Sequence, residues 1–353
     1  MSDITRRQLL LSLPALAITP RILMQSPKPS ISVKALNQFT LLVSDVKRSV
    51  DFYQGLFGMP IQARQGSTVL LRIGDGPQFL AIGPAGSNPP SIAPVIGMSV
   101  ENFNAERVMN TLAQHGVTKA DPADAGLSGG AMKVRLKPRG PENGGAKEGT
   151  PELFMGDPDG LVIQLTDPKY CGGAGALGEV CGSLEQAPKK GLIAAKNLSH
   201  FTINVSNGSR SNDFYRDVFG LPIRSRQGAA EGLGVGPGVM FVMFAGGGGA
   251  RGAANAPPRP ASINHVSLNM EKFNPDEVLK LLASYGIAAR ENAQGPAGPL
   301  KSYVTLRMEN RGGAPGGTPE LYFTDPDGLL LQIQDVSYCG GAGFLGNVCE
   351  DNK

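Results

Sequence analysis

The sequence predicts an α+β fold made of two tandem domains, each built from two modules of a strand, a helix and further strands. The main observation is an internal repeat: LNQFTLLVSDVKRSVDFYQGLFGMPIQARQG at 36–66 matches LSHFTINVSNGSRSNDFYRDVFGLPIRSRQG at 198–228 without a gap. A second pair, TPELFMGDPDGLVIQL and TPELYFTDPDGLLLQI, recurs farther along. The repeat is about 160 residues long, which suits a domain rather than a solenoid unit. The hydrophobic content of 41% is that of a globular protein.

The first module of each domain is predicted from hydrophobic periodicity. Phe39, Leu41 and Val43 alternate with their neighbours, which is typical of a strand. A helix begins after Ser44-Asp45 and ends at Gly58, because these residue types favour the two ends of a helix. STVLLRIG and QFLAIG then read as strands.

The second module repeats this order. The strand VIGMSV precedes a helix, NAERVMNTLAQHG, that closes on Gly116 with His115 at its end as a surface or capping residue. MKVRLKP, PELFM and LVIQL are the next strands. Asp157-Pro158-Asp159-Gly160 is predicted to be a tight turn, since Pro and Gly suit its second and last positions.

These elements give a domain at 32–182, a linker at 183–196 and a second domain at 197–350. Forty-eight glycines and 28 prolines cluster in segments such as FAGGGGARGAANAPPRP, which predicts long surface loops. The net charge of +3 argues neither for nor against nucleic acid as a partner, but no basic stripe interleaved with aromatic residues is present, which speaks against one.

Residues 1–26 are predicted to be a targeting segment. Arg6 and Arg7 precede an apolar run, Leu9 to Ile18, that is too short to span a bilayer. A twin-arginine pair followed by an apolar run resembles a bacterial Tat signal, which implies a periplasmic or secreted protein. The alternative is a disordered basic tail. No later segment of the sequence is apolar enough to be a membrane span.

The four cysteines fit an oxidising compartment. Cys171 and Cys181 enclose nine residues, as do Cys339 and Cys349, and two local disulfides are the favoured interpretation. A zinc site is disfavoured because the pairs lack Cys-x2-Cys spacing and a nearby histidine. Spacing alone leaves pairing across the two repeats open.

Two segments carry a resemblance to a known superfamily. The opening strand followed by Ser-x-x-Phe-Tyr-x-x-x-Phe-Gly-x-Pro, and the closing Asp-Pro-Asp-Gly-x-x-x-Gln strand, resemble the vicinal-oxygen-chelate superfamily of glyoxalases, bleomycin-resistance proteins and extradiol dioxygenases. The resemblance implies that each domain curls into a half-open barrel around a divalent metal. It covers nearly all of 32–350 and is specific for the fold, not for a reaction.

The resemblance places metal ligands on the first, fifth and last strands of the second domain. These positions are His200, His265 and Gln332, and two of the three histidines in the chain fall on them. The implied cofactor is a divalent metal, with Fe2+ first and Mn2+, Zn2+ or Ni2+ as alternatives. Gln332 stands where a mononuclear oxygenase favours a carboxylate. Glu320 is a candidate substitute, although its recurrence as Glu152 favours a structural role.

Tyr322 matches the tyrosine that extradiol enzymes place ten residues before the last ligand, and the resemblance implies that it hydrogen-bonds the substrate. The acid–base histidine expected upstream is missing between Gly298 and Tyr322.

The first domain has Gln38, Val95, Gln164 and Phe154 at the corresponding positions, which predicts that it holds no metal.

The sequence therefore favours a metal-dependent enzyme, dioxygenase-like or glyoxalase-like, with its site in the second domain and a small substrate bearing adjacent oxygens. Homo-oligomer formation is compatible with it. The alternative is a non-catalytic binder of the bleomycin-resistance type. In that case His200 and His265 are core histidines bonded to backbone carbonyls or merely line a pocket.

Overall fold

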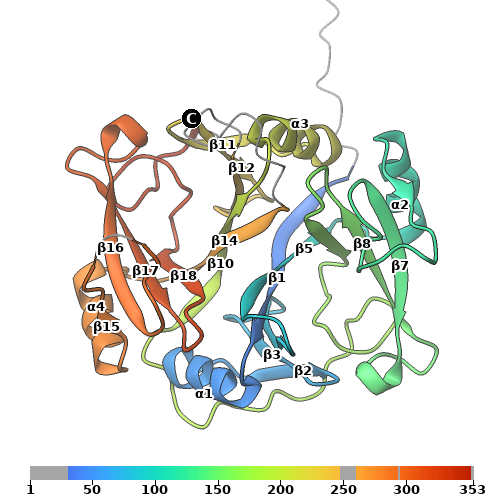
Figure 1. The fold of residues 1–353 in the computed structure, drawn as a ribbon, viewed down its shortest axis with the longest axis horizontal. Coiled ribbons are helices and arrows are strands. Elements are labelled where there is room, and N and C mark those ends of the chain that lie inside the picture. The colour runs from blue at the N-terminus through green and yellow to red at the C-terminus, as the bar shows by residue number, and fades with distance from the viewer. Residues whose placement is uncertain (1–30, 247–259, 293–294, 351–353) are drawn as a thin grey trace, which may run out of the picture.

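The computed structural model describes residues 31–246, 260–292 and 295–350. Its strands form two nine-stranded sheets, one from each repeat, with two α-helices accompanying each sheet (Figure 1). This confirms the predicted α+β class and the two tandem domains. Arg6 and Arg7 lie outside the described residues.

The first domain contains the elements β1 to β9 with α1 and α2. Their bounds are β1 Val33–Val43, α1 Val46–Phe57, β2 Ile61–Gln65, β3 Thr68–Arg72, β4 Phe79–Pro84, β5 Ser91–Val100, α2 Ala105–Gln114, β6 Thr118–Lys119, β7 Lys133–Arg139, β8 Thr150–Gly156 and β9 Val162–Thr166. A 3-10 turn, η1 Pro141–Asn143, follows β7. The strand IQARQ of β2 and the two-residue β6 were not predicted.

The second domain repeats this order with β10 to β18, α3 and α4. Their bounds are β10 Ala195–Asn204, α3 Gly208–Phe219, β11 Ile223–Gln227, β12 Ala230–Gly234, β13 Phe241–Ala245, β14 Ser262–Met270, α4 Pro275–Ser284, β15 Ala288–Ala289, β16 Lys301–Arg307, β17 Thr318–Thr324 and β18 Leu330–Asp335. The 3-10 turn η2 Glu309–Arg311 matches η1.

The strand order shows how the two modules of a domain join. The first sheet runs β2-β3-β4-β1-β5-β9-β8-β7-β6, and the second has the equivalent order β11-β12-β13-β10-β14-β18-β17-β16-β15. The opening strands of the two modules, β1 with β5 and β10 with β14, pair antiparallel at the centre. Each opening strand is also parallel to the last strand of its own module. A ligand on each of the first, fifth and last strands therefore lies near the middle of the sheet.

Local sequence explains the helix ends. The Asp45 side chain accepts a hydrogen bond from the Arg48 backbone N–H at 3.0 Å, which caps the start of α1. Gly58 closes the helix in the left-handed region at φ 68°, where glycine carries no steric penalty. His115 caps the C-terminus of α2, as the sequence predicted.

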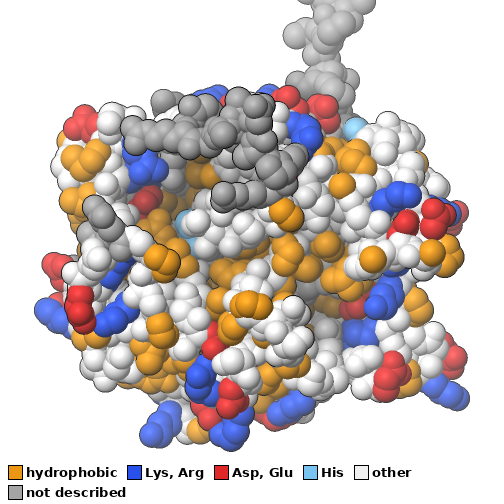
Figure 2. All heavy atoms as spheres, in the orientation of Figure 1, with side chains coloured by type: hydrophobic (Ala, Val, Ile, Leu, Met, Phe, Trp, Pro, Cys, Tyr) orange, Lys and Arg blue, Asp and Glu red, His pale blue; other side chains and the backbone are white. Residues whose placement is uncertain are grey.

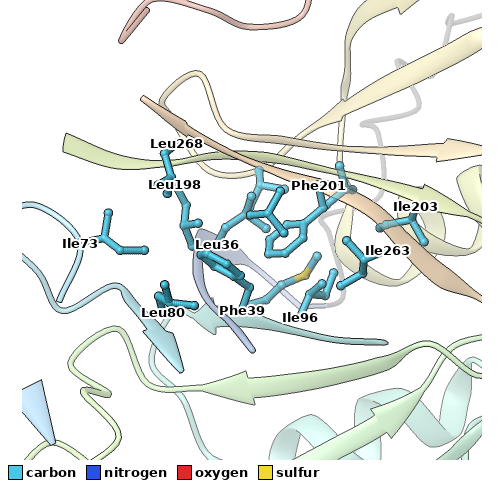
Figure 3. Packing of buried hydrophobic residues seen from close by; sticks show 14 of the residues in the cluster. Leu36, Phe39, Ile73, Leu80, Ile96, Leu198, Phe201, Ile203, Ile263 and Leu268 are labelled. Carbon is cyan, nitrogen blue, oxygen red and sulfur yellow. The ribbon is translucent and has the colours of Figure 1, made fainter. Parts of the chain in front are cut away.

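One hydrophobic core joins the two domains. Phe39 of β1 meets Phe201 of β10 edge to face, with ring centroids 6.5 Å apart. Figure 3 shows residues of both domains around this pair, namely Leu36, Ile73, Leu80 and Ile96 from the first and Leu198, Ile203, Ile263 and Leu268 from the second. Because strand residues alternate between faces, the neighbours of these core residues point to the opposite face of each sheet.

The two Asp-Pro-Asp-Gly turns link the domains reciprocally. Asp327 accepts hydrogen bonds from the Ser44 hydroxyl at 2.6 Å and from Arg48 at 2.5 Å, where α1 begins. Asp159 does the same for α3, accepting from Ser206 and from Arg210 at 2.8 Å. In Figure 1 α1 accordingly lies beside the second domain and α3 lies at the opposite end of the molecule. The predicted turn is present in both domains, and the second aspartate of each turn hydrogen-bonds to the start of a helix in the other domain.

The structure contains the disulfides Cys171–Cys181 and Cys339–Cys349, which use all four cysteines of the chain. The pairing is local, and each bridge closes the segment that follows the last strand of its domain. Within the described residues, no helix is long and apolar enough to cross a membrane.

Candidate metal centre in the second domain

Strand pairing brings the three predicted ligand positions together. His200 on β10 lies opposite Ser267 on β14, and Ser267 lies opposite Gln332 on β18. His265 is two residues before Ser267 and therefore points to the same face of β14. All three predicted side chains are buried, with exposed fractions of 2% for His200, 6% for His265 and 1% for Gln332. The structure thus groups them on one face of the second sheet, opposite the shared hydrophobic core.

The two imidazoles stand at a right angle to each other. Their ring centroids lie 5.5 Å apart with an interplanar angle of 85°. Two ring nitrogens that each bind one ion at about 2.0–2.1 Å require centroids within about 6.5 Å of each other, and this spacing satisfies that limit. The His200 ring is held from outside the pair by Phe241, which stacks on it at 4.3 Å, and by Tyr338 at 5.5 Å.

One nitrogen of each ring is already engaged. Nδ1 of His200 lies 3.0 Å from the Ser199 hydroxyl, and Nδ1 of His265 lies 2.8 Å from the side-chain oxygen of Asn264. An amide oxygen only accepts, so it fixes a proton on Nδ1 of His265 and leaves Nε2 with a free lone pair. Partners of this kind orient histidines that ligate metals.

Both histidines are neutral at pH 7. Burial lowers the pKa of His200 well below its usual value, and repulsion from a protonated His265 and from the Arg307 guanidinium lowers it further. Burial also lowers the pKa of His265 to about 4, against a smaller opposing effect of the Gln332 side chain. Neutral imidazole is the form that binds a metal, so the environment favours ligation rather than an ion pair.

Gln332 provides the observation that bears most directly on the third ligand. Its Oε1 is buried and forms no hydrogen bond with any described residue, although the Gln332 side chain is close enough to His265 to raise the pKa of that imidazole. An unpaired buried carbonyl oxygen costs about 1–3 kcal/mol unless something binds it. An ion between this oxygen and the two imidazoles would satisfy it, so the donor set fits a divalent metal.

Tyr322 lies beside His265, with ring centroids 5.2 Å apart and perpendicular planes. Its hydroxyl donates to Glu320 at 3.3 Å. Glu320 also accepts from Arg307 at 2.8 Å and from Tyr338 at 3.1 Å. The Glu320 carboxylate thus accepts three hydrogen bonds. Within the described part of the chain, no group of three or more His, Cys, Asp or Glu side chains is arranged to hold a metal ion. These contacts favour the structural role for Glu320 over the role of a substitute ligand.

The first domain fills the same place with a different network. Gln38 donates to Oε1 of Gln164, Gln164 donates to the Tyr170 hydroxyl at 3.2 Å, and Tyr170 donates to Glu152 at 2.6 Å. The atom that corresponds to the unpaired Oε1 of Gln332 is therefore satisfied by an amide. Gln38 keeps an unpaired Oε1 of its own, but it has no imidazole beside it.

Sequence reasoning missed several residues around the site. Phe241 and Tyr338, which hold the His200 ring, carry no local signal of function, although Tyr338 precedes a cysteine in both repeats. A row of side chains also leads outward from the site: Tyr303 stacks on Tyr322 at 5.3 Å, and Arg290 lies 4.8 Å over the Tyr303 ring. Alignment of the repeats could have found this row, because all of its members differ between the two copies.

Residues 35–165 and 197–333 match the Glyoxalase/Bleomycin resistance protein/Dioxygenase superfamily. The match covers most of the chain, and the protein belongs to this superfamily. The two matched regions correspond to the two repeats. No curated protein matches the sequence.

Several solved structures are similar over most of the chain. The Mn(II)-bound glyoxalase from Novosphingobium aromaticivorans is 16% identical with a TM-score of 0.53, covering 86% of this chain and 82% of that one. Homoprotocatechuate 2,3-dioxygenase from Brevibacterium fuscum is 15% identical with a TM-score of 0.55, covering 88% and 83%. The 2,3-dioxygenase LapB from Pseudomonas sp. KL28 is 17% identical with a TM-score of 0.55, covering 86% and 92%. At these identities the likeness establishes the shared fold.

Proposed function

We propose that the second domain is a divalent-metal site of a dioxygenase-like or glyoxalase-like enzyme, with His200, His265 and Gln332 as its protein ligands. The observation that carries the proposal is the unpaired Oε1 of Gln332 next to two neutral, perpendicular imidazoles. A divalent ion bound there would supply Lewis-acid chemistry, or oxygen activation if it is Fe2+, to a small substrate that offers two adjacent oxygens. Mn2+, Zn2+ and Ni2+ are the alternative ions.

The residues around the ligands have separate tasks in this proposal. Ser199 and Asn264 orient the imidazoles through Nδ1, while Phe241 and Tyr338 fix the His200 ring. Tyr322 is the candidate proton donor to a substrate oxygen. Its hydroxyl proton is shared with Glu320 at 3.3 Å, which is a long bond, so the hydroxyl can turn to a substrate at modest cost.

Dioxygenase-like chemistry is the favoured branch. The spacing of Tyr322 from Gln332 supports it, and so does the lack of ligand residues in the first domain. The likeness to two 2,3-dioxygenases over most of the chain also supports it. The glyoxalase branch is supported by a glutamine in the ligand set, because some glyoxalases use that ligand, and by the likeness to a Mn(II)-bound glyoxalase.

A non-catalytic binder is the second candidate. It is favoured by the lack of a carboxylate ligand: among the described residues no cluster of three His, Cys, Asp or Glu side chains is suited to a metal. In this case the neutral histidines line a pocket for a small molecule.

Metal content separates the two candidates. The protein is purified from the periplasm of an expressing bacterium, and the bound metal is measured by mass spectrometry for wild type, His200→Ala, His265→Ala and the first-domain control Gln164→Ala. The proposal expects one ion per chain in wild type and in Q164A, and loss of the ion in both histidine variants. Metal-free wild type that also fails to take up Fe2+, Mn2+, Zn2+ or Ni2+ would favour the binder.

We also propose export by the twin-arginine pathway to the periplasm, and domain limits of 32–182 and 197–350 around a linker at 183–196. The two disulfides are compatible with an oxidising compartment. Replacement of Arg6 and Arg7 by lysine should retain the protein in the cytoplasm, as measured by fractionation.

A further inference from the structure

The row of side chains that leads outward from His265 exists only in the second domain. It consists of His265, Tyr322, Tyr303 and Arg290, in contact one after another. The first domain has Val95, Phe154, Arg135 and Ala120 at the matching positions, as the two repeats and their strand registers define them. The row therefore accompanies the histidine site rather than the fold.

The row lies on the same face of the second sheet as His265. Tyr322 faces His265 and is directly opposite Tyr303 in the pairing of β17 with β16. Both tyrosines are partly exposed, unlike the fully buried core on the other face. They give the barrel an aromatic wall between the proposed metal ligands and Arg290, which suits a planar apolar body.

Arg290 is not satisfied as a structural arginine usually is. It donates one hydrogen bond, to the carbonyl oxygen of Gly295, while its buried Nε has no partner among the described residues. Arg135 of the first domain shows the contrasting arrangement, because its two terminal nitrogens donate to the carbonyl oxygens of Gly126, Asp121 and Asp124 at 2.8 Å each. A buried guanidinium N–H without a partner marks a place where an acceptor is missing.

We infer that Arg290 is the carboxylate-recognition residue of the second-domain site, and that the substrate is an aromatic acid. Its adjacent oxygens reach the histidines, its ring lies along Tyr322 and Tyr303, and its carboxylate accepts from Arg290. The adjacent oxygens rest on the proposed metal function, whereas the contacts with Arg290 and Tyr303 do not require it. The role of Arg290 is to position the substrate and select it.

The test uses catechols that carry a carboxylate on tethers of increasing length, each paired with its neutral methyl ester. Binding is measured by titration calorimetry to metal-free and to Mn2+-loaded full-length protein. A charged hydrogen bond of this kind corresponds to about tenfold tighter binding or more, so the best acid should exceed its ester by that factor. Arg290→Met should abolish the acid's advantage, Arg290→Lys should keep part of it, and Tyr303→Leu should weaken acid and ester alike.

Arg135→Met removes an arginine of the first domain, at the position that matches Tyr303, and as a control it should leave the acid preference unchanged. Acid preference in metal-free protein that disappears in R290M supports the inference even if no metal binds. Equal binding of acid and ester, no binding of any probe, or an unchanged preference in R290M overturns it. An R290M variant that loses only thermal stability assigns Arg290 to loop packing and also overturns it. None of these results affects the metal measurements on the histidine variants.

Discussion

The two domains share one fold and one buried polar network but differ at its inner end. Both contain an arginine, a glutamate and a tyrosine in contact, Arg139–Glu152–Tyr170 in the first domain and Arg307–Glu320–Tyr338 in the second. In the first domain this network continues through Gln164 to Gln38. In the second, no hydrogen bond among the described residues joins Tyr338 to Gln332, and Oε1 of Gln332 is left unpaired beside two imidazoles.

The difference teaches that the shared network is structural, and that the residues replaced between the two domains are those of the candidate site. A glutamine at position 38 can reach across the sheet because Gly97 lies beneath it: a Cβ at Gly97 would lie 2.5 Å from Cγ of Gln38. Ser267 occupies the matching place in the second domain. The substitution of glutamine by histidine is therefore linked to a second one, glycine by serine.

Exchanging these residues should give the largest effect. His200→Gln should lower metal affinity by more than the roughly 10–100-fold that is typical when a residue contacting a ligand is lost, because it removes a proposed ligand itself. It should also crowd Ser267, so the double variant His200→Gln/Ser267→Gly should melt at a higher temperature than H200Q alone. Metal titration and thermal unfolding measure the two effects. An H200Q variant that keeps one ion per chain would remove His200 from the ligand set.

A carboxylate at the third ligand position should also act differently in the two domains. Gln332→Glu adds a charge that neutralises part of the ion, so we expect roughly tenfold or more tighter binding of Mn2+. In metal-free protein the same variant should be less stable than wild type, since it buries an unpaired charge. Gln164→Glu in the first domain should destabilise without any gain in metal binding. Weaker Mn2+ binding by Q332E would argue against coordination at this position.

The two disulfides close loops of equal length, so removing each one compares the two domains directly. Removing either bridge by double serine substitution should lower the free energy of unfolding by about 2–3 kcal/mol, because each closes a loop of similar size. Only the Cys339–Cys349 pair follows the tyrosine that stacks on His200. Its removal should therefore also weaken metal binding, whereas C171S/C181S should not. Equal metal affinities for the two variants would show that Tyr338 does not depend on the bridge.

Much of the fold could be predicted because its signals are local. The Asp45 cap, the Gly58 stop and the alternation along β1 each arise within a few residues. The repeat then extended these assignments to the second domain. The strands β2 and β6 escaped because IQARQ is largely polar and TK is only two residues long.

The candidate site was predicted only in part, because most of its contacts join residues that are far apart in the sequence. His200, His265 and Gln332 could be named by matching strands to a known superfamily, and the structure places them together. The unpaired oxygen of Gln332 and the row to Arg290 depend on side-chain packing between distant strands, which no local pattern encodes. The contacts of Asp159 and Asp327 with the helices of the other domain were missed likewise, because their partners are 47 or more residues away.

A smaller effect is expected from Asp157 and Asp325, the first aspartates of the two Asp-Pro-Asp-Gly turns, and here the two domains should behave alike. Burial raises the pKa of Asp157 and of Asp325 to about 6, although each accepts two backbone N–H bonds and one from a tyrosine of the other domain. A carboxyl whose pKa is higher in the folded state binds protons preferentially there, so its ionisation destabilises the fold as pH rises from about 4 through about 6. The buried histidines act in the opposite direction over this window, because their pKa values are lowered.

The pH dependence of wild-type stability therefore does not isolate the aspartates, and the contribution of each is measured by comparing the free energy of unfolding of a variant with that of wild type. Asp157→Asn keeps an oxygen for the backbone donors and removes the charge. The free energy of unfolding of D157N minus that of wild type should increase between pH 5 and pH 7.5, by about 1–2 kcal/mol, and D325N should give a parallel curve. Urea unfolding at several pH values measures both. Flat difference curves would mean that these carboxyls titrate normally in the fold, and a slope in only one variant would show that the two interdomain contacts are not equivalent.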